Sequence, residues 1–389
     1  MKYDFTSILD RRGKDAAAYD NVGAHVIAPA RPKEGFDIIP MWVADMNFPV
    51  VPTIPSFGYF FPTDKYYDSI VQWHEKRNGV TGLTKEHIGY ENGVLGGVVS
   101  ALNVLCSRGD NVLVHSPTYS GFTSCLTNAG YSIVLSPLVQ DEQGIWRMDF
   151  EDMEKKIVAN HIHTALFCSP HNPTGRVWER WELEKAMEIF QRHGVYVISD
   201  EIWSDIIRPG QKHIPTQMVN SYAKEHTVAL YAPSKTFNLA GLQISNIFVP
   251  NPELRKKLLK EITAAGYSQV GLMGLVACQA AYEEGAEWLA QLKAYLEENR
   301  KFVKAYLEEH LPEIRLIEPE GTYLLWLDFK ALHLNEKELE HLIVDKAHLW
   351  LDSGAMFGPD GEGFERINIA CPRATVEKAL KQLEAAIRG

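Results

Sequence analysis

One lysine in this sequence has a setting that favours covalent chemistry. Lys235 comes just after the apolar run Val228–Tyr231, from which it is separated by a short segment that ends in Pro233-Ser234. The run is typical of a strand buried on both faces, so the lysine should emerge at the carboxyl edge of a sheet, where α/β proteins bind ligands. An amine that is partly withdrawn from water has a lowered pKa and can condense with an aldehyde. The alternative is a surface lysine in a turn.

An aspartate occupies a similar position after a second apolar run. Asp200 follows the run Val195–Ile198, so the same argument places its carboxylate at the same edge of the sheet. A carboxylate in that position can keep a positively charged group of a ligand in place. The alternative is an aspartate that caps a helix N-terminus, a common use of residues that follow strands.

Five further stretches accompany Lys235 along the chain. They are MWVADMNF at residues 41–48, SPTYSGF at 116–122, SPHNPTG at 169–175, ISDEIW at 198–203 and ERINIACPR at 365–373. In this order they resemble the aminotransferase-like (fold type I) enzymes that use pyridoxal 5'-phosphate (PLP). Within that superfamily they are most similar to the MalY/PatB group of carbon–sulfur β-lyases, which includes cystathionine β-lyases and cystalysin. The resemblance extends from about Met41 to the C-terminus.

The resemblance implies PLP as the cofactor and gives roles to four residues. Lys235 would form a Schiff base with the cofactor and later take the proton from the substrate Cα, while Asp200 would keep the ring nitrogen protonated. Asn172 would donate to the phenolic oxygen of the ring. Tyr119 would stack on the ring and contribute to catalysis. The alternatives are a turn residue for Asn172 and core packing for Tyr119.

The resemblance also predicts how the phosphate of the cofactor is bound. We expect it over a glycine-rich loop, residues 93–97, where the backbone of Val94 and Leu95 can approach and a helix N-terminus favours an anion. Many relatives use a serine three residues before the lysine. This chain has Ala232 there, so Ser234 is expected to substitute.

Two expectations concern the rim of the cofactor site. Tyr59 is expected to reach the phosphate from a neighbouring subunit, which makes a homodimer necessary for a complete site. Trp203 stands where the family has a tyrosine or histidine near the phenolic oxygen, and its indole can donate but not accept a hydrogen bond. Ser120 and Asn47 also depart from the family pattern, which leaves the details of the reaction open.

Arg366 matches the family residue that binds the α-carboxylate of the substrate. A planar guanidinium suits this task because it can donate two parallel hydrogen bonds to a carboxylate. The backbone around Trp42 and Val43 is expected to close the other side of that carboxylate. A surface salt bridge is the alternative for Arg366.

The order of apolar runs predicts an α/β fold. Between Asp64 and about Gly285, helical periods alternate with short apolar runs, which is typical of a mostly parallel sheet covered by helices. Strands are expected at VLVHSP, SIVL, TALFCSP, VYVIS, the run before Lys235 and ISNIFV, all with their loops on one edge. We predict an N-terminal segment (residues 1–50) that packs on the small domain, a large PLP-binding domain of the PLP-dependent transferase type (51–285) and a smaller α+β C-terminal domain (286–389).

Composition sets limits on partners and location. The 389 residues carry 50 acidic against 39 basic side chains, a net charge of −11, which argues against nucleic acid as a partner. No apolar run approaches the roughly 20 residues needed to span a membrane, and we expect a cytoplasmic protein. The five cysteines include no CxxC pair, which indicates reduced thiols, and no metal site is expected.

Three functions are compatible with these residues. The first is a PLP-dependent β-lyase that acts on cystathionine or related cysteine S-conjugates and releases a thiol, pyruvate and ammonia. The second is an aminotransferase that moves an amino group between an L-amino acid and a 2-oxo acid. The third is a protein of the same fold used for regulatory binding.

Overall fold

The chain divides into two compact units. The computed structural model describes residues 4–12, 17–20, 22–23, 29–37, 39–44, 46–48, 62–266 and 271–389. The larger unit comprises residues 51–172 and 176–289, and the smaller one comprises residues 1–50, 173–175 and 290–389. Tyr59, predicted to reach the cofactor phosphate, lies outside the described residues.

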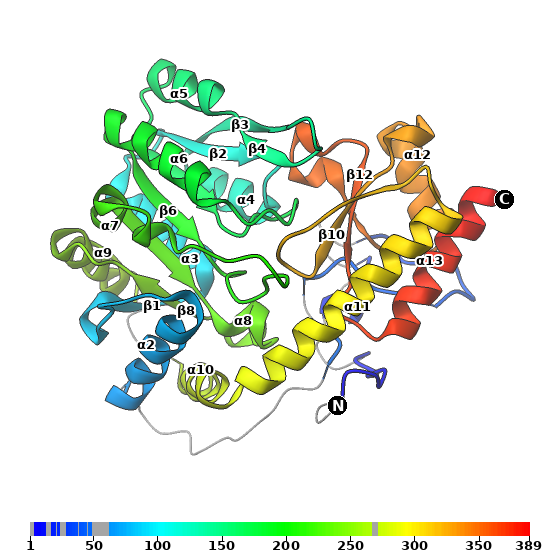
Figure 1. The fold of residues 1–389 in the computed structure, drawn as a ribbon, viewed down its shortest axis with the longest axis horizontal. Coiled ribbons are helices and arrows are strands. Elements are labelled where there is room, and N and C mark those ends of the chain that lie inside the picture. The colour runs from blue at the N-terminus through cyan, green and yellow to red at the C-terminus, as the bar shows by residue number, and fades with distance from the viewer. Residues whose placement is uncertain are drawn as a thin grey trace. The chain divides into compact units, whose positions relative to one another are not determined.

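An eight-stranded sheet forms the centre of the larger unit (Figure 1). Its spatial order is β1-β8-β7-β6-β5-β2-β3-β4. The strands are β1 (Ile88–Asn92), β2 (Asn111–Ser116), β3 (Ser132–Gln140), β4 (Trp146–Met148), β5 (Thr164–Cys168), β6 (Tyr196–Asp200), β7 (Thr227–Tyr231) and β8 (Ile244–Phe248). All residues of β5, β7 and β8 are buried, as expected for strands that read as continuous apolar runs.

The sheet is mostly parallel but not entirely so. Strands β3, β2, β5, β6 and β7 run parallel to their neighbours in that series, as predicted. Strand β8 pairs antiparallel with β7, with Ala229 opposite Phe248. The prediction that every strand places its loop on one edge is therefore wrong for ISNIFV. The connection after β7 turns back through two short helices instead of forming a long crossover, so β8 runs in the opposite direction.

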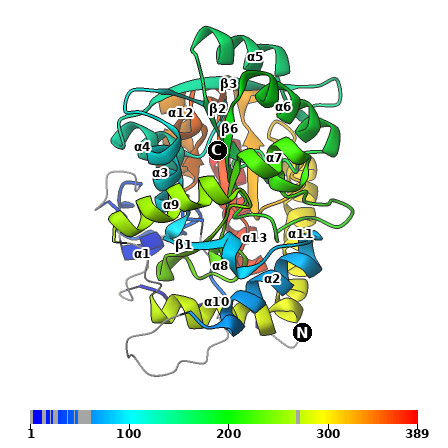
Figure 2. The ribbon, with the colours of Figure 1, turned by 90° about the vertical axis from the view of Figure 1, so that its left-hand side faces the viewer.

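Helices cover both faces of this sheet. Figure 2 shows α3, α4 and α9 on one side of the strands and α6 and α7 on the other. The helices of the larger unit are α2 (Asp64–Asn78), α3 (Gly93–Leu105), α4 (Ser120–Asn128), α5 (Phe150–Ala159), α6 (Arg180–His193), α7 (Ser221–His226), α8 (Pro233–Thr236), α9 (Pro252–Ala264) and α10 (Leu272–Glu284). A continuous core joins α3, α4 and α9 to the sheet through Val98, Leu102, Leu126, Leu258 and Val228.

The glycine-rich stretch at residues 93–97 is helical, which corrects the expectation of a loop. Helix α3 begins at Gly93, whose φ of +76° suits glycine and whose N–H donates to the carbonyl of Gln243 at 2.9 Å. Gly97 is needed because an added Cβ would lie 2.8 Å from a methyl group of Leu230. The glycines thus bring the first turns of α3 close to β7.

The smaller unit contains an antiparallel sheet of order β11-β12-β10-β9. Its strands are β9 (Arg315–Ile317), β10 (Leu324–Asp328), β11 (Asp352–Ser353) and β12 (Phe364–Asn368), and its described helices include α1 (Ala17–Asp20), α12 (Glu336–Glu340) and α13 (Arg373–Arg388). A π-helical turn, His341–Lys346, continues α12. The long helix α11 spans Ala286–His310. This α+β content agrees with the predicted fold class, while the domain boundaries stay a prediction.

The described ranges of the chain contain neither a membrane-spanning helix nor a metal-binding cluster. None of the helices that the structure describes combines the length and the apolar character needed to cross a membrane. In those ranges, no group of three or more His, Cys, Asp or Glu side chains is arranged to hold a metal ion.

Candidate active site

Four predicted site residues follow four neighbouring parallel strands. Tyr119 comes after β2, Asn172 after β5, Asp200 ends β6 and Lys235 comes shortly after β7. In the sheet these strands lie side by side in the order β7-β6-β5-β2. Because parallel strands end at the same edge, the four residues gather at the carboxyl edge of the larger unit, as the sequence predicted.

Lys235 lies in the short helix α8, which starts immediately after β7. Pro233 occupies the first turn of α8, where its missing N–H costs nothing. The lysine Nζ lies 5.7 Å from the centre of the Trp203 ring, within the range of a cation–π contact. Trp203 itself is 2% exposed, so one side of the amine faces a buried aromatic surface.

Asp200 is a buried carboxylate that uses one of its two oxygens to accept a backbone hydrogen bond. Oδ1 accepts the backbone N–H of Ile202 at 3.0 Å. Burial raises the pKa of Asp200 to about 7, although the Ile202 hydrogen bond and the positive charge of Lys235 oppose the rise. Among the residues that the structure describes, none donates a hydrogen bond to Oδ2. The second oxygen of this buried carboxylate is therefore available to a hydrogen-bond donor of a ligand.

Tyr119 and Asn172 are held by their local sequence. Tyr119 precedes α4, and its ring makes an edge contact with Phe122 at 5.4 Å between centroids. The ring lies over Gly121, where an added Cβ would come 2.6 Å from the Cζ atom of Tyr119, so glycine is required there. Asn172 is 5% exposed and follows a turn through Pro170.

The predicted phosphate residues lie on two helices of the larger unit. Val94 and Leu95 are in the first turn of α3, whose first N–H groups have no acceptor within the helix. Ser234 is in α8 and is 9% exposed. Helix α3 contacts β6 and β7, the strands that lead to Asp200 and Lys235.

Arg366 belongs to the smaller unit and already has an acidic partner there. Its guanidinium donates to Asp352 of the neighbouring strand β11 and lies 4.8 Å from the centre of the Phe357 ring. Both members of the pair are 5% exposed. Burial raises the pKa of Asp352, and the charge of Arg366 opposes that rise. Asp352 was missed by the sequence reasoning, because a strand of two residues leaves no periodic signal.

Val43 is tied to the strand that carries Arg366. The Asn368 side chain donates to the Val43 carbonyl oxygen at 2.9 Å. Arg366 and Asn368 are two residues apart on β12, so their side chains lie on the same face of the strand. The smaller unit thus places the Val43 backbone next to the face from which Arg366 projects.

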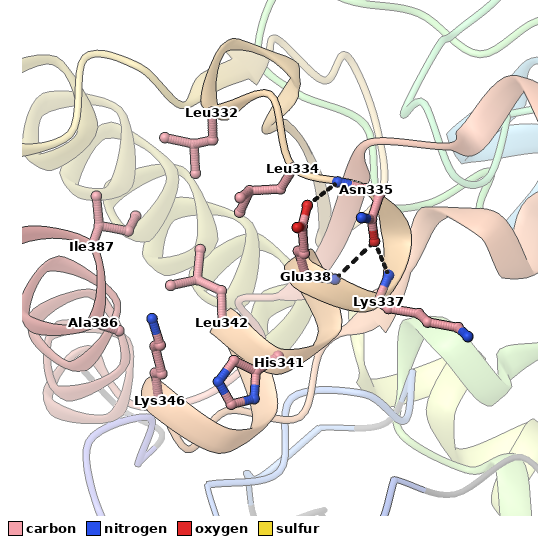
Figure 3. A pocket seen from close by; sticks show the side chains of 10 residues that line it. All are labelled: Leu332, Leu334, Asn335, Lys337, Glu338, His341, Leu342, Lys346, Ala386 and Ile387. Carbon is pink, nitrogen blue, oxygen red and sulfur yellow. Dashed lines mark hydrogen bonds between the residues drawn. The ribbon is translucent and has the colours of Figure 1, made fainter.

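A separate pocket in the smaller unit contains none of the predicted site residues. It has a volume of about 560 Å³, and its walls come from the segment before α12, the π-helical turn and α13 (Figure 3). Figure 3 shows apolar side chains around the hollow, namely Leu332, Leu334, Leu342, Ala386 and Ile387. At its rim, the Asn335 side chain caps α12 by accepting the N–H groups of Lys337 and Glu338.

Comparison with known proteins identifies the class of protein that this fold and site define. The family profile for aminotransferase class I and II matches residues 55–383. The chain belongs to this family and is PLP-dependent.

Within the family, the chain groups with the PatB, MalY and cystalysin carbon–sulfur lyases. It is 36% identical to cystathionine beta-lyase PatB of Bacillus subtilis, over 90% of this chain and 93% of that protein. Cystalysin from Treponema denticola, whose crystal structure contains PLP, is 32% identical with a TM-score of 0.93, and the match covers 100% of this chain and 99% of that one. A PLP-bound putative aminotransferase from Clostridium difficile is 37% identical with a TM-score of 0.92, covering 99% and 100%.

The residues at the sheet edge fit the cofactor. Burial of Asp200 disfavours an isolated negative charge, so a cationic ring nitrogen is a suitable partner for this carboxylate. Lys235 supplies an amine beside it, and the first turn of α3 supplies backbone donors that suit a phosphate.

Proposed function

We propose that this enzyme is a carbon–sulfur β-lyase that acts on cystathionine or a related cysteine S-conjugate. With uptake of water, the reaction would release a thiol, pyruvate and ammonia. The observation that supports it most is that the Lys235 amine and the buried Asp200 carboxylate lie at the same sheet edge, in a chain similar to cystathionine beta-lyase PatB.

In this proposal, four residues of the larger unit bind the cofactor and take part in catalysis. When bound, PLP supplies an aldehyde carbon and a ring that accepts electron density from the substrate Cα. Lys235 would hold the cofactor and would remove the proton from the substrate Cα. Asp200 keeps a proton on the ring nitrogen. Asn172 donates to the phenolic oxygen, and Tyr119 covers one face of the ring and assists catalysis.

The remaining predicted contacts fix the phosphate and the substrate. Val94, Leu95 and Ser234 bind the phosphate, with Tyr59 of a second copy completing this site in a homodimer. Trp203 borders the lysine and the phenolic side of the ring.

Recognition of the amino-acid substrate would come from the smaller unit. Arg366 donates two hydrogen bonds to the α-carboxylate, next to the Val43 backbone. Location in the cytoplasm stays a prediction.

An aminotransferase is the second candidate, supported by the similarity to the putative aminotransferase from Clostridium difficile. The same residues serve both reactions up to removal of the Cα proton. The outcomes then differ, because a lyase expels the β-substituent whereas an aminotransferase returns the proton to the cofactor and needs a 2-oxo acid.

Product analysis with and without an acceptor separates the two. Purified enzyme is incubated with cystathionine in the absence of any 2-oxo acid, and pyruvate is measured over many turnovers. We expect steady pyruvate release. Absence of pyruvate, together with formation of the 2-oxo acid of cystathionine that stops after one equivalent per site and resumes when another 2-oxo acid is added, would establish the aminotransferase instead.

Substitution of the lysine tests the site itself. Lys235→Ala should abolish the visible absorbance of the bound cofactor and the release of pyruvate, while Lys256→Ala, at an exposed lysine of α9, should change neither. An unchanged spectrum in Lys235→Ala would show that the amine is elsewhere.

A further inference from the structure

Two buried carboxylates in the turn after Asp200 have no role in the chemistry described so far. Glu201 is completely buried, and the Asp205 side chain is 6% exposed. An ionised carboxylate in such surroundings is stable only if several donors satisfy it. One donor to each carboxylate lies close to Lys235 in the sequence, Tyr231 before it and Thr236 after it.

Glu201 binds the last residue of β7 through a hydrogen bond. Its Oε2 accepts the phenol of Tyr231 at 2.5 Å and His213 Nε2 at 2.7 Å, and its Oε1 accepts the Thr216 N–H at 2.9 Å. The Glu201 N–H donates to Leu230 at 2.8 Å. Tyr231 is the last residue of β7, four residues before the lysine. Burial raises the pKa of Tyr231 well above its usual value, so its phenol stays a donor.

Asp205 binds the residue that follows Lys235. Its Oδ2 accepts the Thr236 hydroxyl at 2.9 Å, and both of its oxygens lie 3.2 Å from the indole nitrogen of Trp73. Arg77 Nε forms an ion pair with Oδ1 at 3.6 Å. Thr236 directly follows Lys235, is completely buried and ends α8. Trp73 and Arg77 belong to α2, so Asp205 anchors the lysine-bearing turn to a long helix.

We propose that Glu201 and Asp205 are positioning residues that fix Lys235 relative to Asp200 on the bound cofactor. The two carboxylates lie one and five residues after Asp200, and they hold the chain four residues before and one residue after Lys235. The cofactor ring is rigid, so its aldehyde carbon and its ring nitrogen can meet their partners together only if the amine and the Asp200 carboxylate are correctly spaced. A misplacement of about 1 Å can cost roughly 10²-fold in rate.

The proposal rests on PLP dependence and on the role proposed for Lys235, but not on which substrate is cleaved. Two variants remove one donor each and leave both carboxylates in place: Tyr231→Phe and Thr236→Val. Thr236→Ser keeps a hydroxyl and serves as the conservative rescue. Tyr222→Phe is the matched control, because the Tyr222 phenol donates to Phe190 and Val195 in the same unit without contacting the lysine segment.

The first measurement needs no substrate. PLP is added to cofactor-free protein, and the rate at which the yellow lysine-bound form appears is compared with cofactor binding followed by tryptophan fluorescence. We expect covalent attachment to slow by about ten-fold in Tyr231→Phe and Thr236→Val and by more in the double variant. Binding before attachment should change by less than about two-fold, and Thr236→Ser should attach at close to the wild-type rate.

The second measurement uses turnover and thermal unfolding. The same variants should lose kcat with little change in KM, and their unfolding temperatures should fall no further than that of Tyr222→Phe. Attachment and kcat at wild-type rates would overturn the proposal, as would losses that follow the unfolding temperature alone. If the enzyme proves not to cleave cystathionine, the attachment rates still decide the positioning roles.

Discussion

Two buried aspartates, one in each unit, differ in what neutralises them. Asp352 of the smaller unit is paired with the Arg366 guanidinium from the same sheet. Asp200 of the larger unit accepts one backbone N–H, and burial leaves its pKa near 7. The charge at Asp352 is thus satisfied within the chain, whereas Asp200 is suited to a cation brought by a ligand. If Arg366 binds the substrate carboxylate as proposed, that carboxylate must compete with Asp352 for the guanidinium.

The largest effect, a loss of kcat, should follow from removing the charge of Asp200. Asp200→Asn leaves the size of the side chain unchanged, but an amide cannot keep a proton on the ring nitrogen. We expect kcat to fall by about 10³-fold, in the range found when one electrostatic contact to the reacting group is lost. Steady-state pyruvate release checks this, with cofactor content measured in parallel. Activity within ten-fold of wild type would remove Asp200 from the mechanism.

The same substitution should stabilise the protein when the cofactor is absent. The pKa of Asp200 is raised from 3.8 to about 7, so between these pH values the folded state binds more protons than the unfolded state. The free energy of unfolding contributed by this group therefore falls as pH rises from about 4 to about 7.

Chemical unfolding of cofactor-free protein between pH 5 and pH 8 measures this effect. Above pH 7, Asp200→Asn should be more stable than wild type by up to about 4 kcal/mol, from about 1.4 kcal/mol for each pH unit. Asp68→Asn, at an exposed position on α2, should leave the pH dependence unchanged. Equal pH dependence in Asp200→Asn and wild type would show that the group is not buried as described.

In the smaller unit, removal of the cation should lower the free energy of unfolding. Arg366→Met leaves Asp352 buried without its ionic partner, and breaking such a pair costs about 3–5 kcal/mol. We expect a lower free energy of unfolding together with a raised KM for the amino acid. A stability equal to that of wild type would show that the pair does not persist in solution.

The smallest effect, a change in KM, is expected from removing the charge of Asp352. Asp352→Asn removes the charge that holds Arg366, so KM for the substrate should fall by a few-fold while kcat changes little, because one competitor for the guanidinium is weakened. Initial rates over a range of substrate concentrations check this. A raised KM would mean that Asp352 orients Arg366 for the substrate instead of competing with it.

The position of the candidate residues at the sheet edge could be predicted from the sequence because they follow continuous apolar runs. Lys235 and Asp200 come after β7 and β6, and strands of this kind end at a common edge when they are parallel. The direction of β8 could not be predicted in the same way, because an apolar run does not record whether it pairs parallel or antiparallel.

Other features were missed because their cause lies in tertiary contacts. The glycines at the start of α3 suggested a loop, although this stretch is helical and Gly97 allows close packing against Leu230 of β7. Asp352, Glu201 and Asp205 gain their importance from partners that are distant in sequence, such as Arg366, Tyr231 and Thr236. Contacts of this kind between polar side chains leave no periodic pattern of residue types in the sequence, so they could not be predicted from it.

The central claim is that the Lys235 amine forms the covalent link to PLP opposite Asp200. Reduction of the cofactor-loaded enzyme with borohydride fixes this link permanently, and peptide mass analysis then locates it. The account predicts one added pyridoxyl phosphate group per chain, on the peptide that contains Lys235. A group found on another lysine, or no group in a fully active enzyme, would contradict it.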